Sequence, residues 1–131
     1  VIAITHGATF VARAFSGDKD ETKNIIIEAI NHKGYALVDI FQPCVSFNRV
    51  NTYKWYKENS YYLEDGYDPS DANAALKKSM ESGPFPLGII YKEDGKADFS
   101  DNLVAYSEMT EPLYKRDVDR NKLNELLDSM K

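Results

Sequence analysis

The sequence predicts an α/β domain built around a strand–helix–strand unit, and three observations support this class. Residues 8–15 form a short β-branched and aromatic run of the kind found in buried strands. A helical pattern follows over 22–33. Residues 35–41 are then apolar almost throughout, as is typical of a parallel strand covered on both faces. A right-handed crossover through the helix makes the two strands parallel neighbours.

The helix of this unit has recognisable start and stop signals. Asp18 and Asp20 precede it, and acidic residues favour a helix start because the first backbone N–H groups lack partners. Its apolar positions predict one buried face, marked by Ile26 and Ile30 and widened by apolar neighbours on both sides. Gly34 ends the helix, since glycine accepts the left-handed backbone found just after a helix.

A single strand–helix–strand unit leaves a sheet with open edges and is not expected to stand alone. The rest of the chain offers one further clear strand, at residues 86–91. We therefore expect partner strands from outside this chain.

Beyond the second strand the sequence predicts short elements joined by irregular segments. Helices are expected over 52–58 and 70–80, and a turn over 93–96. Residues 97–116 show weak periodicity and are expected to form an irregular connection. The chain ends in an amphipathic helix from about Asp117. Its apolar stripe consists of Leu123, Leu126, Leu127 and Met130.

Composition limits the classes of function. A chain of 131 residues with 43% hydrophobic and 28% charged residues is ordinary for one globular domain. The net charge of −5 disfavours nucleic-acid binding, which needs clustered Lys and Arg. The sequence contains no apolar run of the length that a membrane span needs. Its single cysteine excludes an internal disulfide framework and a four-cysteine metal site made by this chain alone.

Cys44 is the main candidate for site chemistry. It follows the carboxyl end of the second strand, where ligands gather in open α/β sheets. Both histidines, His6 and His32, are expected at the opposite end of the parallel strands, which disfavours catalysis by a Cys–His pair. Two interpretations remain. Cys44 is either a small buried hydrophobe or one thiolate ligand of a metal site completed from outside the chain.

The stretch 47–67 is unusually aromatic and carries interleaved basic residues. Such a surface can stack bases, but acidic residues in the same stretch argue against that use. Packing onto a larger surface or a protein–protein contact is favoured. The aromatic residues are Phe47, Tyr53, Trp55, Tyr56, Tyr61, Tyr62 and Tyr67.

Other polar motifs in the chain are interpreted as structural. Ser16-Gly17 precedes a helix, but no glycine-rich phosphate motif is present, and neighbouring acidic residues would repel an anion. The acidic groups Asp18/Asp20/Glu21 and Glu93/Asp94 lack the spacing of a calcium loop and are expected to be solvated charges.

Two motifs point to a family. Gly7-Ala-Thr-Phe-Val-Ala-Arg13 and Gln42-Pro43-Cys44, at this separation, resemble the β subunit of the 2-oxoacid:ferredoxin oxidoreductases. Later segments are similar to the C-terminal extension of that subunit. The resemblance implies that residues 1–45 form the last βαβ unit of a thiamine-diphosphate-binding fold with a mostly parallel sheet. Residues 46–131 would then form an aromatic-rich α+β extension.

The resemblance also implies a chemistry. Such enzymes use thiamine diphosphate and Mg²⁺ to decarboxylate a 2-oxoacid such as pyruvate, and they transfer the acyl group to coenzyme A. Electrons pass through a [4Fe–4S] cluster to ferredoxin, within anaerobic metabolism. By the same resemblance Cys44 corresponds to one cluster ligand. The implied partner is an α subunit, and the implied setting is a cytoplasmic oligomer that binds neither nucleic acid nor membrane.

The sequence also departs from the family pattern. It contains neither the Gly-Asp-Gly-Asp motif for Mg²⁺ and diphosphate nor a Cys-x-x-Cys pair for further cluster ligands. We therefore expect the C-terminal portion of such a subunit, with no bound cofactor and no activity by itself. The alternative is a stand-alone α/β module that binds other proteins and has no catalytic role.

Overall fold

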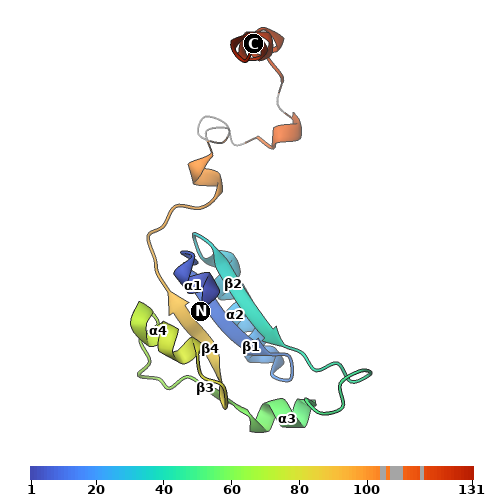
Figure 1. Ribbon diagram of the computed structural model, residues 1–131, viewed down its shortest axis with the longest axis vertical. Helices are drawn as coiled ribbons and strands as arrows, with labels where there is room; N and C mark the ends of the chain where they lie inside the picture. The colour runs from blue at the N-terminus through green and yellow to red at the C-terminus, as the bar shows by residue number, and fades with distance from the viewer. Residues whose placement is uncertain (104–105, 107–110, 116) are drawn as a thin grey trace. The chain divides into compact units, whose positions relative to one another are not determined.

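The computed structural model describes residues 1–103, 106, 111–115 and 117–131 (Figure 1). The chain divides into two compact units, Val1–Phe99 and Ser100–Lys131. The elements of the first unit are α1 (Ile2–Thr5), β1 (Phe10–Phe15), α2 (Lys19–Asn31), β2 (Ala36–Phe41), α3 (Tyr53–Glu58), β3 (Ser60–Tyr62), α4 (Ala72–Ser79) and β4 (Phe85–Lys92). The described residues of the second include short 3₁₀ helices at Ser100–Asn102 and Leu113–Lys115, and α6 (Arg120–Ser129).

The four strands form one mixed sheet in the order β2-β1-β4-β3. β1 and β2 are parallel, with Phe10 opposite Ala36 and Phe15 opposite Phe41, which confirms the predicted strand–helix–strand unit. β3 is parallel to β4, whereas β4 is antiparallel to β1. The sheet is therefore mostly parallel. β3 is a strand that the sequence did not indicate, because three residues are too few to establish an alternating pattern.

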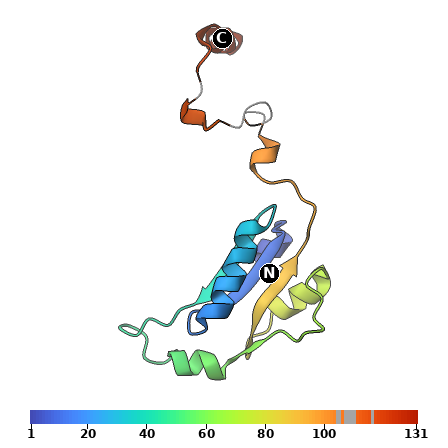
Figure 2. The same ribbon diagram turned by 180° about the vertical axis from the view of Figure 1, so that it is seen from behind.

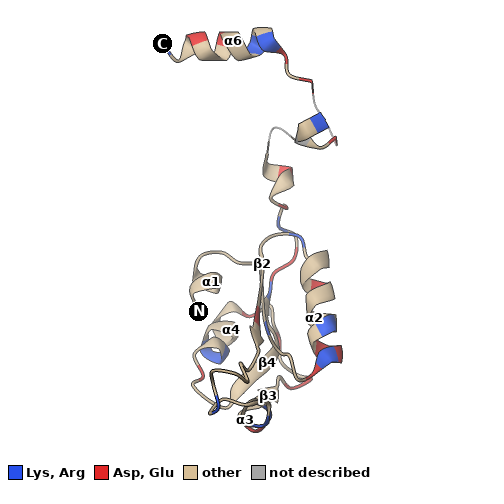
Figure 3. Cartoon of the chain, turned by 90° about the vertical axis from the view of Figure 1, so that its right-hand side faces the viewer, with Lys and Arg blue, Asp and Glu red and all other residues tan. Residues whose placement is uncertain are grey.

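Helices cover both faces of this sheet. α2 lies on one face, and α1 and α4 lie on the other (Figure 3). β1 contributes to both cores because successive side chains of a strand point to opposite faces. Phe10, Ala12 and Ala14 pack with Ile25 of α2. The opposite core is formed by Ala8, Val11, Ala75, Ile90 and Tyr91. The view from behind shows α2 lying along β1 and β2 (Figure 2).

The predicted buried face of α2 was wrong. Ile25 is the buried isoleucine at 2% exposure, whereas Ile26 is 37% and Ile30 is 75% exposed. The start of the helix sets this rotation. Asp18 caps it by accepting a hydrogen bond from the Glu21 N–H, and the Thr22 hydroxyl donates to the Phe15 carbonyl at 2.9 Å. An isoleucine-rich helix has more than one apolar face, so these contacts decide which face meets the sheet.

The expectation that the second strand is covered on both faces is also wrong for the part of the chain described. β2 is an edge strand, and each of its residues is either half-buried or exposed. Leu37 is 37% and Ile40 is 38% exposed. An apolar strand at a sheet edge is unusual, because such edges readily pair with further strands.

In the second unit, α6 begins at Arg120, three residues later than expected, and Asp119 caps it. The predicted apolar stripe is present on one side of this helix and is 45–73% exposed. Part of the connection predicted over 97–116 lies outside the described residues. Its described part includes the two 3₁₀ turns. The described part of the chain contains no helix with the length and apolarity that crossing a membrane requires.

Candidate functional site

Cys44 lies in the loop that joins β2 to α3. β2 ends at Phe41, and the loop then projects away from the sheet before the chain enters α3 at Tyr53 (Figure 1). The Cys44 side chain is exposed and forms no disulfide. The structure therefore places this cysteine beyond a strand's carboxyl end, as predicted. It also excludes the interpretation of Cys44 as a buried hydrophobe within this chain.

A tight turn surrounds the thiol. The Asn48 N–H donates to the Cys44 carbonyl at 2.9 Å, which closes the turn. The Asn48 side-chain oxygen accepts from the N–H groups of Val50 and Asn51, both at 3.0 Å. The backbone N–H groups of Phe47 and Ser46 hydrogen-bond to the Cys44 sulfur and lower the pKa of the thiol below its usual value. The turn thus favours the thiolate, the form that binds metal.

The surroundings of Cys44 suit a metal site to which this chain contributes one ligand and other segments contribute the rest. Among the described residues, no three His, Cys, Asp or Glu side chains are grouped so that they could hold a metal ion. An exposed thiol whose pKa is lowered by backbone N–H groups suits one ligand position of an iron–sulfur cluster. Cys44 therefore fits such a cluster only if the other ligands come from elsewhere.

The two histidines lie away from Cys44, as predicted. His6 follows α1 and precedes β1. The Nε2 atom of His32 lies 2.8 Å from the Thr9 hydroxyl, at the start of β1, and its ring packs against Phe10. Both therefore sit at the amino end of β1, whereas Cys44 follows the carboxyl end of β2. This arrangement provides no Cys–His pair for nucleophilic catalysis.

Aromatic residues of α3 pack against the ends of the strands. The Tyr56 ring stacks on Phe41 with centroids 4.9 Å apart, and Phe85 of β4 meets Phe41 edge-on at 5.4 Å. Trp55 contacts both Tyr56 and Phe85. The Arg13 guanidinium lies 5.0 Å from the centre of the Phe41 ring. We call these five residues the aromatic clamp: Arg13, Phe41, Trp55, Tyr56 and Phe85.

The aromatic clamp uses part of the aromatic stretch for packing within this chain, against the ends of its own strands. The predicted packing onto a larger surface, or onto another protein, stays a prediction. Phe47 of the same stretch is 93% exposed, whereas Tyr62 and Tyr53 are 45% and 43% exposed and contact Asp18 and Phe15. The ion pair between Arg13 Nε and Asp39 Oδ2, at 2.9 Å, joins the clamp to β2. This pair was not predicted, and only the strand register that places Arg13 opposite Asp39 reveals it.

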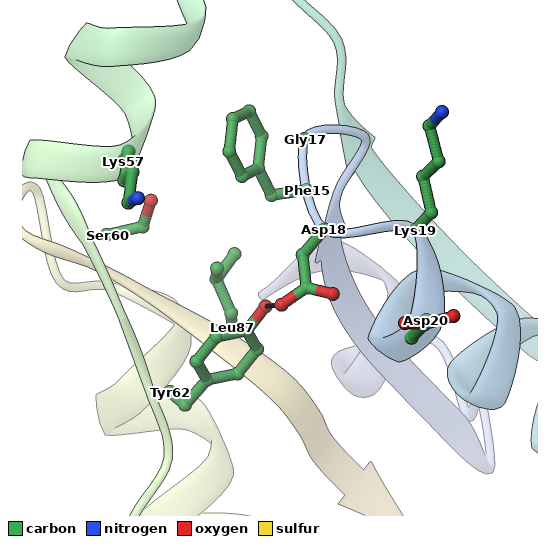
Figure 4. Close-up of a pocket in the computed structure, with 9 residues that line it drawn as sticks. All are labelled: Phe15, Gly17, Asp18, Lys19, Asp20, Lys57, Ser60, Tyr62 and Leu87. Atoms are coloured by element: carbon green, nitrogen blue, oxygen red, sulfur yellow. Dashed lines mark hydrogen bonds between the residues drawn. The ribbon is translucent and has the colours of Figure 1, made fainter.

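A cavity of about 430 Å³ lies at the carboxyl end of β1, between the start of α2 and residues of α3, β3 and β4 (Figure 4). The Tyr62 hydroxyl donates to Asp18 Oδ2 at 2.6 Å beside this cavity. Burial and the Asp18 carboxylate raise the pKa of Tyr62 well above its usual range. The residues that line the cavity are Phe15, Gly17, Asp18, Lys19, Asp20, Lys57, Ser60, Tyr62 and Leu87.

No pattern in the sequence indicates this cavity, because its walls come from segments far apart in the chain. Asp18 and Tyr62 are 44 residues apart. The Asp18 side chain accepts from the Glu21 N–H and so caps α2, which agrees with a structural rather than a phosphate-binding role for the preceding Ser16-Gly17. Both acidic and basic side chains line this cavity, so its charge does not indicate which class of ligand it would bind.

The fold is thus an α/β segment with an exposed cysteine beyond the carboxyl end of one of its strands. The C-terminal family of pyruvate ferredoxin oxidoreductase β subunits matches residues 44–108. Subunit β of 2-oxoacid:ferredoxin oxidoreductase 2 from Aeropyrum pernix is 39% identical over 115 residues, which cover 79% of this chain and 37% of that protein. The β subunit from Sulfolobus sp is 36% identical over 118 residues, covering 81% and 39%.

A solved structure is also similar. The match is to 2-oxoglutarate:ferredoxin oxidoreductase from Magnetococcus marinus with 2-oxoglutarate, coenzyme A and succinyl-CoA bound. The TM-score is 0.76 at 31% identity, covering 95% of this chain and 42% of that chain. The chain is thus homologous to the C-terminal region of 2-oxoacid:ferredoxin oxidoreductase β subunits, which confirms the family resemblance of its motifs. It spans well under half the length of these relatives.

Proposed function

We propose that this chain works as the C-terminal part of the β subunit of a 2-oxoacid:ferredoxin oxidoreductase. The complete enzyme would convert a 2-oxoacid and coenzyme A into acyl-CoA and CO₂, and it would pass the electrons to ferredoxin. The observation that carries this proposal is the match of residues 44–108 to the C-terminal family of these β subunits, which begins at the exposed Cys44. The strand–helix–strand unit just before it agrees with the end of a cofactor-binding α/β fold.

In this proposal Cys44 supplies one thiolate to a [4Fe–4S] cluster whose other ligands lie outside residues 1–131. Thiamine diphosphate with Mg²⁺ would supply the decarboxylation chemistry of the complete enzyme, and the cluster would carry electrons away. This chain places the thiol in a turn whose backbone N–H groups lower its pKa. Such donors to a cluster sulfur stabilise its reduced, more negative state and so raise the reduction potential.

The remaining surfaces of the chain would serve assembly. We assign residues 1–45 to the end of the cofactor-binding fold and 46–131 to the extension. The β2 edge, with its half-exposed Leu37 and Ile40, suits continuation of the sheet. The outward isoleucines of α2 and the apolar stripe of α6 suit contacts within the β subunit or with an α subunit. By itself the chain would lack the residues for catalysis.

The test replaces Cys44 in the assembled enzyme that contains this chain. We expect Cys44→Ser to lower bound iron, to remove or alter the electron paramagnetic resonance signal of the reduced cluster and to abolish ferredoxin reduction. Ser46→Ala, in the same turn, is the matched control and should leave the iron content and the signal unchanged. A Cys44→Ser enzyme with a full iron content and an unchanged signal would refute the assignment of Cys44.

A module that only binds other proteins is distinguished by the same preparation. In that case the chain would not co-purify with an oxidoreductase, and replacing Cys44 would leave the iron–sulfur cluster of the enzyme unchanged. The half-exposed Leu37 and Ile40 of β2 are apolar side chains that could contact another protein. The match over residues 44–108 favours the enzyme.

A further inference from the structure

Three exposed apolar side chains lie in the loop that carries Cys44. Val45 is 70%, Phe47 is 93% and Val50 is 75% exposed, and Cys44 itself is exposed. The loop projects from the sheet between β2 and α3 (Figure 1). One exposed apolar residue is ordinary, but a group of them in one short loop is typical of a surface that contacts another segment. We call Val45, Phe47 and Val50 the apolar patch.

Hydrogen bonds within the loop hold the apolar patch beside the thiol. The Asn48 N–H donates to the Cys44 carbonyl at 2.9 Å, and this contact between residues four apart closes a single helical turn. Residues three apart in such a turn are neighbours, with Cβ atoms roughly 5–6 Å apart, so Phe47 lies next to Cys44. The Asn48 side-chain oxygen accepts from the N–H groups of Val50 and Asn51 at 3.0 Å and fixes Val50 at the end of the same turn.

The geometry of a shared cluster indicates what would cover the apolar patch. The chain spans 37% of the Aeropyrum pernix subunit and 39% of the Sulfolobus sp subunit, so more than half of each relative has no counterpart in these residues. Under the proposed function, the other cluster ligands come from such an outside segment. That segment must reach iron atoms bound to the Cys44 sulfur. It therefore has to pass over the residues beside Cys44 in its turn.

The charge of the loop agrees with this occupant. Between Asp39 and Glu58 the chain has no acidic residue, although its net charge is −5. The basic residues of this interval are Arg49, Lys54 and Lys57. Lys54 pairs with Glu58 at 3.8 Å, which leaves Arg49 as the basic residue nearest to Cys44 in the chain. Four thiolates make a [4Fe–4S] centre a net anion, which basic residues stabilise and carboxylates would repel.

We propose that the apolar patch is the surface on which the β-subunit segment with the other cluster ligands docks, and that it excludes water from the cluster. This inference rests on the proposed function of Cys44 and adds the partner of its loop. Phe47 is the most exposed of the three side chains and lies next to the thiol, so it is the centre of the contact. An apolar shell controls the access of solvent to a metal site and thereby its reduction potential.

The first test identifies the occupant in the assembled enzyme that contains this chain. The photoreactive residue p-benzoylphenylalanine replaces Phe47, and mass spectrometry locates the crosslink formed on irradiation. We expect crosslinks to the segment of the same β subunit that carries the other cluster ligands. Crosslinks to the α subunit, to a second β subunit or to added ferredoxin would overturn the proposal, as would the absence of any crosslink.

The control for this test places the same photoreactive residue at Phe99. Phe99 is 77% exposed and follows β4, whose last residue, Lys92, lies opposite Phe10 at the amino end of β1. Cys44 follows the carboxyl end of β2, so Phe99 has comparable exposure at the other end of the sheet. Crosslinks from position 99 to the segment with the cluster ligands would show that the labelling is not specific to the apolar patch and would count against the proposal.

The second test measures the cluster itself. Phe47→Ala should leave the thermal unfolding midpoint of the isolated chain unchanged, because Phe47 is 93% exposed there. In the assembled enzyme we expect this variant to retain its iron but to raise the cluster reduction potential, because water admitted to the site stabilises the more negative reduced state. Phe47→Leu keeps an apolar side chain and should retain the wild-type potential. An unchanged potential in Phe47→Ala would refute the exclusion of water.

Cys44→Ser in the same enzyme separates this proposal from the proposed function. Cluster loss in Cys44→Ser, together with an unchanged potential in Phe47→Ala, would overturn the role of the apolar patch alone. An intact and unchanged cluster in Cys44→Ser would overturn the function of Cys44, and the role of the apolar patch with it.

Discussion

The Tyr62 hydroxyl donates a 2.6 Å hydrogen bond to the carboxylate of Asp18, which also caps the first turn of α2. This bond joins β3 to the helix of the strand–helix–strand unit. It lowers the pKa of Asp18 and, together with burial, raises the pKa of Tyr62. The bond thus adds a direct contact between residues 44 positions apart to the sheet pairing of β1 with β4.

Tyr62→Phe should lower the free energy of unfolding by about 1 kcal/mol at neutral pH, since one hydrogen bond to a partly exposed carboxylate is lost. The effect should depend on pH in two directions. The lowered pKa of Asp18 gives stability that is present above its unfolded value of 3.8 and is lost in more acid solution. The raised pKa of Tyr62 gives stability that is present below its unfolded value of 10.0 and is lost as the pH rises above it.

Denaturant unfolding of wild type and Tyr62→Phe across this range measures the difference. Tyr35→Phe is a suitable control, because Tyr35 is 61% exposed. A difference that grows as the pH falls below 3.8 would contradict the assigned bond.

The two faces of α2 should respond differently to truncation. Ile25→Ala should cost about 2–5 kcal/mol, because it leaves a cavity against Phe10, Ala12 and Ala14. Ile30→Ala should change stability by no more than about 0.5 kcal/mol in the isolated chain, since Ile30 is 75% exposed. Thermal unfolding of both variants checks this contrast. Equal losses would mean that α2 is rotated relative to the structure.

Gly34 should not tolerate a side chain. Its φ is +120°, and a Cβ atom there would lie 2.3 Å from the Thr9 hydroxyl oxygen. That oxygen also contacts His32 Nε2 and accepts from the Tyr35 N–H. We expect Gly34→Ala to destabilise the chain by about 1–3 kcal/mol.

Gly66→Ala is the control for this prediction, because a Cβ at Gly66 meets no atom within 4 Å. Chemical denaturation compares the two variants. Equal stability of both would show that the corner between α2 and β2 adapts without strain.

Arg13 should contribute more stability than its partner Asp39. Asp39→Ala removes a partly exposed ion pair and should cost at most about 1 kcal/mol. Arg13→Ala also removes the contacts of the guanidinium with Phe41 and Phe85, so we expect a loss of about 1–3 kcal/mol. A double-mutant cycle separates the ion pair from the ring contacts. The prediction fails if the Asp39 variant is the less stable of the two.

Local patterns in the sequence were enough for the strand–helix–strand unit and for the position of Cys44. The signals for these elements are local in the sequence: two apolar runs, at 8–15 and 35–41, and a helix-ending glycine at Gly34. The parallel pairing of β1 and β2 follows from the crossover rule once these elements are recognised. The family motifs lie in the same segments. Sequence alone therefore determined the class of fold and placed Cys44 beyond the end of a strand.

Contacts between segments far apart in the sequence determined the features that local patterns could not predict. The rotation of α2 depends on a cap and on the small side chains of β1, so an isoleucine-rich helix could not reveal that Ile25 rather than Ile30 is buried. The antiparallel return of β4 and the bond between Tyr62 and Asp18 join residues far apart in the chain. The same holds for the stack of Tyr56 on Phe41. Periodicity reports which residues avoid water, whereas only tertiary structure determines which of them meet.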